Sequence, residues 1–180
     1  MINLVKYIDE EFIDHDKSIN NNLVLYEKND SGHKKDKPYS GYLKKSNSDK
    51  DYLIISNLEN LTSNLFYSKK TPSDCDYIFI NLEKKEIYFI EFKGSNQFLF
   101  KDVKKQLLSG QKWLEHFCFC SEIDENALKE FKTYNIWWEY SSRACRSIEP
   151  FYCEDEDIIK IKGNIFIVSK LRHYMKNFNK

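Results

Sequence analysis

The sequence has little of what builds secreted, membrane-spanning or loosely linked proteins. Only 5 Gly and 3 Pro occur among 180 residues, which leaves little material for long flexible linkers. No run approaches the roughly 18 apolar residues of a transmembrane helix, and MINLVKYIDEEF lacks the long apolar core of a signal peptide. The five cysteines are odd in number and match no secreted disulfide framework. We therefore expect a reduced, soluble, cytoplasmic protein without a membrane partner.

The net charge at pH 7 is zero, because 28 basic side chains balance 28 acidic ones. A nucleic-acid coat protein is usually basic overall, although a local basic patch is enough for binding. Charge is nevertheless segregated: His33 to Lys50 contains six lysines and two aspartates, and Glu149 to Asp157 contains five acids and no base. We expect a Lys-rich loop or hairpin at about 31–51, which either closes over nucleic acid or is simply solvated.

Apolar side chains are plentiful enough for a full-sized core. They make up 41% of the chain, and aromatic residues alone make up 16%. A length of 180 residues suits one domain, so we expect a single domain over residues 1–180. His116, Cys118 and Cys120 are spaced too tightly for a usual structural zinc site, and buried thiols are the expected alternative.

Hydrophobic periodicity predicts alternating helices and strands. Residues 2–14 and 101–117 have helical spacing, and 122–132 and the segment from 171 onward are shorter helix candidates. Strands are predicted at 77–82, 87–93 and 134–140, with two more between 158 and 169. The segment 21–28 fits a strand or the end of a helix, and 51–57 fits a strand or the start of a helix. This order predicts an α/β fold with a mixed central β-sheet flanked by helices.

The stretch IEFKG at 90–94 places two opposite charges in an otherwise apolar strand. Because side chains alternate faces along a strand, Glu91 and Lys93 lie on the same face. The short polar connection at 83–86 predicts an antiparallel hairpin, in which the start of the first strand lies beside the end of the second. Asp76 therefore falls near Glu91 and Lys93, so two carboxylates and an amine converge at one edge of the sheet.

Such a cluster has a chemical use. Two neighbouring carboxylates repel each other and favour a divalent cation, and hard oxygen ligands suit Mg²⁺. The backbone carbonyl of Phe92 is a further candidate ligand. A bound metal lowers the pKa of water and neutralises charge on a phosphate. Lys93 could hold or deprotonate the attacking water, or stabilise the phosphate in the transition state.

These residues resemble the motif of the PD-(D/E)XK nuclease superfamily, which has the restriction-endonuclease-like fold. The resemblance rests on Pro72, Asp74 or Asp76, Glu91, Lys93 and Gly94, and it covers residues 71–117 firmly and the later strands loosely. It implies a mixed sheet of four or five strands and Mg²⁺-dependent cleavage of phosphodiester bonds, usually in DNA, with Mn²⁺ as a possible substitute. Restriction, anti-phage defence, mobile-element biology and repair are all compatible roles.

The resemblance also implies further site residues. Gln106, on the helix after the Glu-x-Lys strand, resembles a family site residue, with Gln111 as a weaker candidate. The family's Pro-Asp pair is interrupted here, and we favour Asp76 over Asp74 because Asp76 abuts the strand. An upstream acid completes many family sites; the candidates are Glu10, Glu11, Glu27 and Glu59, with a preference for Glu27. Predicted nucleic-acid contacts are Lys101, Lys104, Lys105, Arg143 and Arg146.

A different interpretation stays open, because a Glu and a Lys two residues apart usually form a solvated face or an ion pair. On that interpretation the chain is a catalytically inactive nuclease-like subunit that binds nucleic acid or assembles with a protein partner. A chain of this length has little room for a sequence-reading domain. We therefore expect weak intrinsic specificity, a homodimer, or a protein partner that supplies targeting.

Overall fold

The computed structural model describes residues 22–27, 39–44, 52–56, 74–94, 100–121, 123, 125–141, 151–153 and 158–178. The helix expected at 2–14 lies outside these ranges. Within them, no helix has both the length and the apolar character that crossing a membrane requires.

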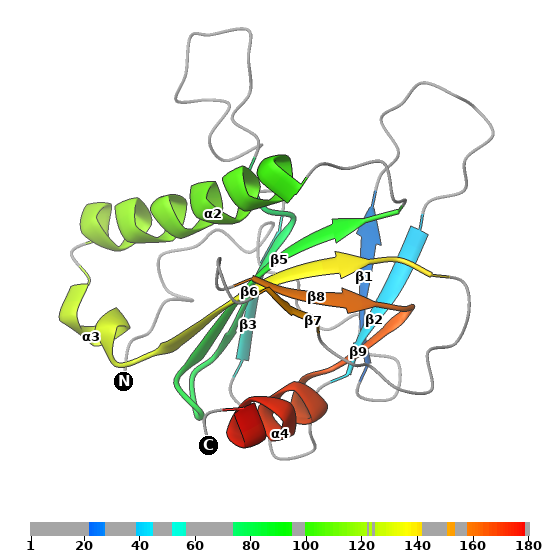
Figure 1. The fold of residues 1–180 in the computed structure, drawn as a ribbon. Coiled ribbons are helices and arrows are strands. Elements are labelled where there is room, and N and C mark those ends of the chain that lie inside the picture. The colour runs from blue at the N-terminus through cyan, green and yellow to red at the C-terminus, as the bar shows by residue number, and fades with distance from the viewer. Residues whose placement is uncertain are drawn as a thin grey trace, which may run out of the picture.

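A six-stranded mixed sheet forms the centre of the protein (Figure 1). Its strand order is β3-β4-β5-β6-β8-β7. The first three strands form an antiparallel meander, β5, β6 and β8 run parallel, and β7 closes the edge antiparallel to β8. The bounds are β3 Tyr52–Ser56, β4 Tyr77–Asn81, β5 Glu86–Lys93, β6 Lys132–Glu139, β7 Phe151–Cys153 and β8 Ile158–Lys162. The sheet and its helices confirm the predicted α/β class, with more strands than the resemblance implies.

A second, three-stranded sheet has the order β1-β2-β9. Its strands are β1 Asn22–Glu27, β2 Tyr39–Lys44 and β9 Ile165–Ile167. Of the loop and the hairpin expected at about 31–51, residues 39–44 fit the hairpin, because they form a strand that pairs antiparallel with β1 and parallel with β9. The physical reason is Leu43, whose side chain is fully buried in the core and gives this polar segment an apolar anchor.

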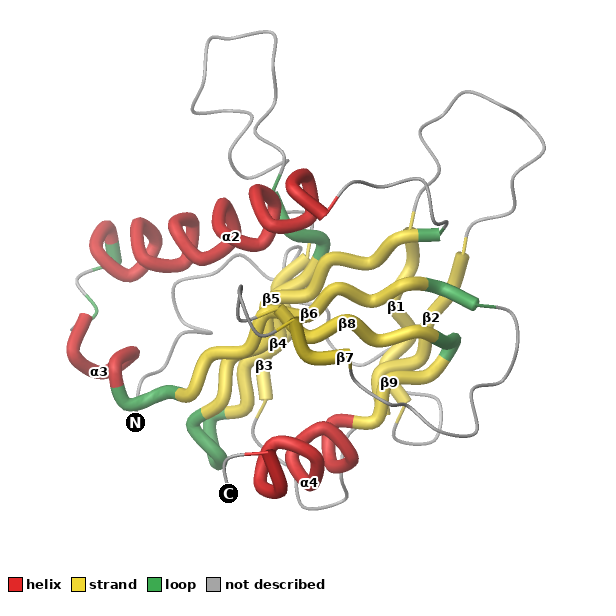
Figure 2. Tube along the Cα trace, in the orientation of Figure 1, coloured by secondary structure: helices red, strands yellow, loops and turns green. Residues whose placement is uncertain are grey.

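Helices cover both faces of the six-stranded sheet (Figures 1 and 2). α2, Phe100–Cys120, packs on one face through an apolar stripe whose buried residues are Val103, Leu107, Gly110, Leu114 and Cys118. The helical spacing predicts all of these but Cys118, and it also predicts Phe117, which is partly buried. α4, Val168–Phe178, lies on the opposite face, and the short α3, Glu125–Lys129, follows α2. Trp137 belongs to the core under α2 and Trp138 to the core under α4, so both indoles are buried, one on each face.

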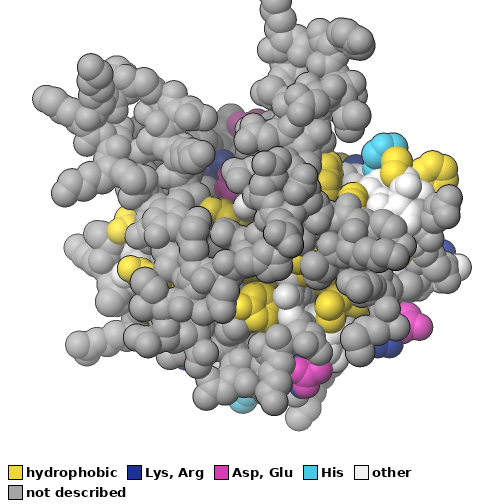
Figure 3. Space-filling view, turned by 180° about the vertical axis from the view of Figure 1, so that it is seen from behind, with side chains coloured by type: hydrophobic (Ala, Val, Ile, Leu, Met, Phe, Trp, Pro, Cys, Tyr) yellow, Lys and Arg dark blue, Asp and Glu magenta, His cyan; other side chains and the backbone are white. Residues whose placement is uncertain are grey.

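The outer surface of α2 keeps some apolar side chains in solvent. Leu108 is 50% exposed and Phe119 is 69% exposed. In the view from behind, apolar side chains are visible at the surface beside a histidine (Figure 3). Isolated exposed apolar residues of this kind are common on proteins and indicate no site by themselves.

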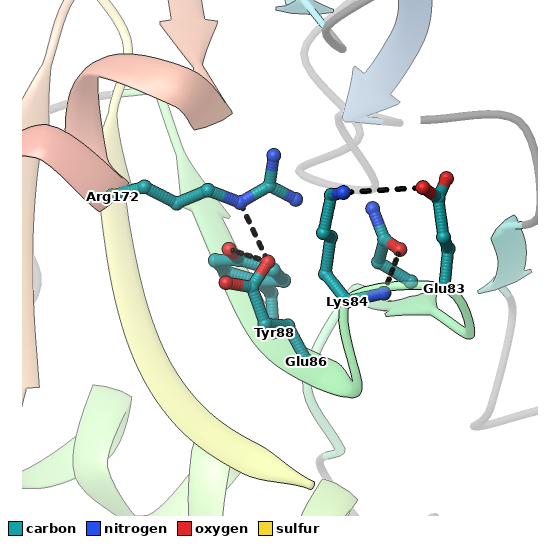
Figure 4. Close-up of polar contacts among 6 residues, drawn as sticks. Glu83, Lys84, Glu86, Tyr88 and Arg172 are labelled. Atoms are coloured by element: carbon teal, nitrogen blue, oxygen red, sulfur yellow. Dashed lines mark hydrogen bonds and ion pairs between the residues drawn. The ribbon is translucent and has the colours of Figure 1, made fainter. Parts of the chain in front are cut away.

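A polar network at the start of β5 fixes α4 to the sheet (Figure 4). Arg172 Nε donates to Glu86 Oε2 at 2.7 Å, and the hydroxyl of Tyr88 donates to the same oxygen at 2.9 Å. Burial, with a further contribution from Glu86, raises the pKa of Tyr88, so its hydroxyl remains a donor. Because this network lies at the opposite end of β5 from Glu91 and Lys93, it serves the packing of α4.

Candidate metal and catalytic site

The candidate site lies where β5 ends, on the face of the sheet that α2 covers. Glu91 and Lys93 alternate with Phe92 along the strand, and they follow Ile87 and Phe89 of the core beneath α2. This is the face that strand alternation predicts. The site therefore lies at the carboxyl end of a buried strand.

Asp76 reaches this site from the segment before β4. The last backbone pair of the β4–β5 ladder is Tyr77 with Ile90. One step beyond it, the Oδ2 atom of Asp76 accepts a hydrogen bond from the backbone N–H of Phe92 at 2.7 Å. The carboxylate thus continues the ladder in place of a backbone carbonyl. Since the N–H and C=O of a strand residue point to the same side, the carbonyl of Phe92 also faces Asp76.

Lys93 lies between the two carboxylates. Its Nζ forms an ion pair with Oε1 of Glu91 and lies 4.0 Å from Oδ2 of Asp76. The Glu91 side chain is fully buried and that of Lys93 is 9% exposed, whereas that of Asp76 is 30% exposed. Solvent therefore reaches the cluster on the Asp76 side.

Both carboxyl groups are shifted toward protonation. Burial raises the pKa of Glu91 well above its ordinary value, the charge of Asp76 raises it further, and Lys93 opposes the shift. Burial also raises the pKa of Asp76, against the lowering effects of Lys93 and of the Phe92 N–H. When both carboxyl groups are ionised, their two negative charges face only one ammonium group. A bound cation would neutralise the remaining negative charge and so favour the ionised forms.

The donor set fits a hard divalent cation. Oε2 of Glu91 is buried and has no partner of ordinary hydrogen-bond geometry among the described residues, although the backbone N–H of Asp76 lies close enough to the carboxylate to favour its ionised form. A buried carboxylate oxygen without a donor is costly unless it has a ligand. Asp76, Glu91 and the Phe92 carbonyl are the groups that would hold Mg²⁺ here. Among the described residues, this site included, no group of three or more His, Cys, Asp or Glu side chains is placed to hold a metal ion, so the ligand set here is two carboxylates and one carbonyl.

Asp74 has a different partner. Its Oδ1 accepts a hydrogen bond from the hydroxyl of Ser109 on α2. The intervening Cys75 is buried, and burial, together with Glu91, Asp76 and Asp74, raises the pKa of its thiol. Of the two aspartates that the sequence offers as the site residue, Asp76 is therefore the one beside Glu91 and Lys93. Asp74 instead joins the segment before β4 to α2.

Gly110 allows α2 to approach this segment closely. A Cβ atom at Gly110 would lie 2.3 Å from Sγ and 3.3 Å from Cβ of Cys75. Any larger residue would push the helix away from the segment that carries Asp76. The spacing that placed Gly110 on the apolar stripe thus also sets the position of the site.

The two glutamine candidates lie on opposite flanks of α2. Gln111 Nε2 donates to Asn135 Oδ1 of β6 at 2.6 Å, so Gln111 points away from Asp76. Gln106 is half-buried and lies one helical turn before Ser109, on the flank that contacts Asp74. The geometry therefore favours Gln106 over Gln111 as a neighbour of the site.

The remaining candidates are either exposed or outside the described residues. Lys101, Lys104 and Lys105 are exposed in the first turns of α2, which begins at the end of the sheet where β5 ends (Figure 1). Glu27 ends β1, and its side chain is not among those described. The candidates that lie outside the described residues are Glu10, Glu11, Glu59, Arg143 and Arg146.

The histidine and cysteines of α2 do not converge on one point. Cys118 is buried in the core, whereas Cys120 and His116 are exposed, with 3.4 Å between Sγ of Cys120 and Nε2 of His116.

The sequence analysis did not identify three charged residues on the same face of the sheet as the site: Glu139, Lys160 and Lys162. Glu139 ends β6 and is 2% exposed, and it forms ion pairs with Lys160 and Lys162 of β8. The signal was the alternation in IIKIK, which puts both lysines on one face. Their position on the same face of the sheet as Glu91 depends on the parallel pairing of three strands, which no local pattern reveals.

One cavity among the described residues lies away from this site. It has a volume of about 320 Å³ and is lined by Ile87, Leu114, Cys118 and Leu128 among others. These residues place it between α2, α3 and the first half of β5. It is therefore a separate feature from the Asp76–Glu91–Lys93 cluster.

Comparison with known proteins adds no relative: no protein-family model, no curated protein and no solved structure matches the chain. The functional argument therefore depends on the motif and on the geometry of its residues.

Proposed function

We propose that this protein is a metal-dependent nuclease of the PD-(D/E)XK type, which hydrolyses phosphodiester bonds in DNA as an Mg²⁺-dependent endonuclease. The observation that carries the proposal is the convergence of the Asp76 and Glu91 carboxylates on the ammonium group of Lys93, at the buried end of β5. Such a set of groups is expensive to bury for structural reasons alone. A catalytic use accounts for that cost.

Each residue has a role in this proposal. Asp76, Glu91 and the carbonyl of Phe92 would hold the cation, which supplies charge neutralisation at the phosphate and activation of water. Lys93 presents a positive charge that would stabilise the phosphate oxygens as negative charge develops on them. Asp76 is the most exposed of the three side chains, so the substrate would approach from its side. Gln106 would help to orient the substrate or water from α2.

The test is a cleavage assay on supercoiled plasmid, linear duplex DNA, single-stranded DNA and RNA, with Mg²⁺, Mn²⁺ or EDTA. We expect metal-dependent cutting by the wild type and its loss in Glu91→Ala and Lys93→Ala. Lys85→Ala is the matched control, because Lys85 is an exposed lysine in the turn before β5 and forms an ion pair with Glu130. Wild-type cutting that persists in both site variants would overturn the assignment.

A second candidate function is a nuclease-like subunit that binds nucleic acid or a protein partner without cutting. It is favoured by the small ligand set, since only two carboxylates meet in the described part of the site and Lys93 already pairs with one of them. This alternative expects that Mg²⁺ leaves thermal stability unchanged and that nucleic-acid binding survives Glu91→Ala. No cutting under any condition, together with such binding, would favour it.

A further inference from the structure

We propose that Lys160 and Lys162, held in place by Glu139, bind a nucleic-acid backbone phosphate that neighbours the one hydrolysed at Glu91 and Lys93. The inference rests on the proposed nuclease function. It adds a substrate-binding site on β8, formed by Lys160 and Lys162.

The sheet register places both lysines on the same face as the candidate site. In the parallel ladders, Lys93 is paired with Glu139 and Glu139 is paired with Lys162. Paired residues of neighbouring strands project to the same face of the sheet. These three residues therefore form one row of charges across β5, β6 and β8.

A second row lies one step earlier along the same strands. Glu91 is paired with Trp137, and Trp137 is paired with Lys160. Adjacent strands are about 4.8 Å apart, so the backbones of the two lysines on β8 lie about 10 Å across the sheet from the backbones of Glu91 and Lys93. That distance suits a nearby phosphate of the same nucleic-acid strand.

Glu139 fixes the two ammonium groups. Its carboxylate lies 2.8 Å from Nζ of Lys160 and 2.5 Å from Nζ of Lys162. Burial raises the pKa of Glu139, but the hydrogen bonds and charges of the two lysines outweigh burial and lower it, so the carboxylate stays ionised. Lys160 is held from a second side, because its Nζ lies 3.9 Å from the ring centroid of Trp137.

The cluster keeps an excess positive charge that faces solvent. Two ammonium groups share one carboxylate, which leaves one positive charge for an anion. The side chain of Lys160 is 34% exposed and that of Lys162 is 56% exposed, whereas Glu139 is covered by them. A phosphate can therefore contact the lysines from the open side while Glu139 holds them from beneath.

The test measures binding without cleavage. A fluorescent 20-nucleotide DNA and an RNA of the same sequence are titrated in EDTA at several salt concentrations. The proteins are the wild type, Lys160→Met, Lys162→Met and the double variant, because methionine keeps the apolar stem and removes the charge. Lys85→Met is the control, since Lys85 is an exposed, ion-paired lysine of the turn before β5. Thermal melting checks that each variant is folded.

We expect each site variant to bind about 3- to 10-fold more weakly, with a salt dependence shallower by about one unit per lysine. The control should match the wild type, and the nucleic acid that shows the larger loss identifies the substrate. Wild-type affinity and salt dependence in the folded double variant would overturn the inference, even if the wild type cuts DNA. So would a wild type that binds neither oligonucleotide. Weakened binding in a protein that never cuts would instead keep the phosphate site and refute the nuclease function.

Discussion

The carboxylate of Asp76 accepts a 2.7 Å hydrogen bond from the backbone N–H of Phe92, the residue between Glu91 and Lys93. This bond joins the start of the β4 segment to the end of β5. Asp76 consequently has two separable properties: an oxygen acceptor that completes the ladder, and a negative charge beside Lys93. The first supports the fold and the second supports the proposed chemistry.

Two substitutions at Asp76 should separate these properties. Asp76→Asn keeps an oxygen acceptor for the Phe92 N–H, so we expect a folded protein of near wild-type stability that no longer cleaves. Asp76→Ala removes the acceptor as well and should lower the free energy of unfolding by about 1–3 kcal/mol. Chemical denaturation and cleavage assays check both. Full activity in Asp76→Asn would contradict a role for the charge.

Mg²⁺ should stabilise the protein through the same carboxylates. At a Mg²⁺ concentration near 100 times its dissociation constant, the gain is about 2.7 kcal/mol, which corresponds to a rise in melting temperature of roughly 5–10 °C for a chain of this size. Glu91→Gln keeps the shape of the side chain but not its charge, so the rise should disappear. Differential scanning fluorimetry measures both, with Glu83→Gln on the exposed turn as the control. An equal rise in Glu91→Gln would place the metal elsewhere.

Gly110→Ala should disturb the site from a distance. The added Cβ would meet Sγ of Cys75 at 2.3 Å, and the resulting shift should destabilise the protein by about 1–3 kcal/mol and lower activity by moving the Asp76 segment. Cys75→Ala removes the obstructing sulfur, so the double variant Cys75→Ala/Gly110→Ala should recover most of the loss relative to Cys75→Ala alone. Urea unfolding of the wild type, the two single variants and the double variant gives the free energies of unfolding for this double-mutant cycle. If the two substitutions change the free energy of unfolding additively, the contact between positions 110 and 75 does not cause the destabilisation.

The ion pairs of Glu139 should make stability depend on pH. The folded-state pKa of Glu139 lies below its ordinary value of 4.5, so its stabilising effect is present above pH 4.5 and is lost as the pH falls through the folded-state pKa. Glu139→Gln should cost about 1–3 kcal/mol at neutral pH, and its deficit should shrink under acid conditions. Unfolding free energies from pH 7 to pH 3 test this. A deficit that is constant with pH would exclude the charge as its cause.

The hairpin and its charges could be predicted from the sequence because their cause is local. The apolar runs at 77–82 and 87–93 and the short connection between them predict the antiparallel hairpin, and its register brings Asp76 to Glu91 and Lys93. The helical stripe of α2 is equally local, since its apolar residues recur with helical spacing.

Features that depend on distant partners could not be predicted. The strand at 39–44 exists because β1 and β9 pair with it, and Phe151–Cys153 is a strand because it pairs with β8. The row of Lys93, Glu139 and Lys162 requires the parallel order of three strands. Likewise, only the packing of α2 shows that Ser109 engages Asp74 and leaves Asp76 beside Lys93.

The most direct test of the proposed site is the rate of plasmid cleavage by Lys93→Met at saturating Mg²⁺, beside its Mg²⁺-dependent rise in melting temperature. Methionine keeps the buried stem of the lysine and removes only the ammonium group that lies between Glu91 and Asp76. We predict that the Mg²⁺ stabilisation persists while cleavage falls by about 100-fold or more, because Lys93 acts on the reacting phosphate. Cleavage by Lys93→Met at the wild-type rate would contradict the account.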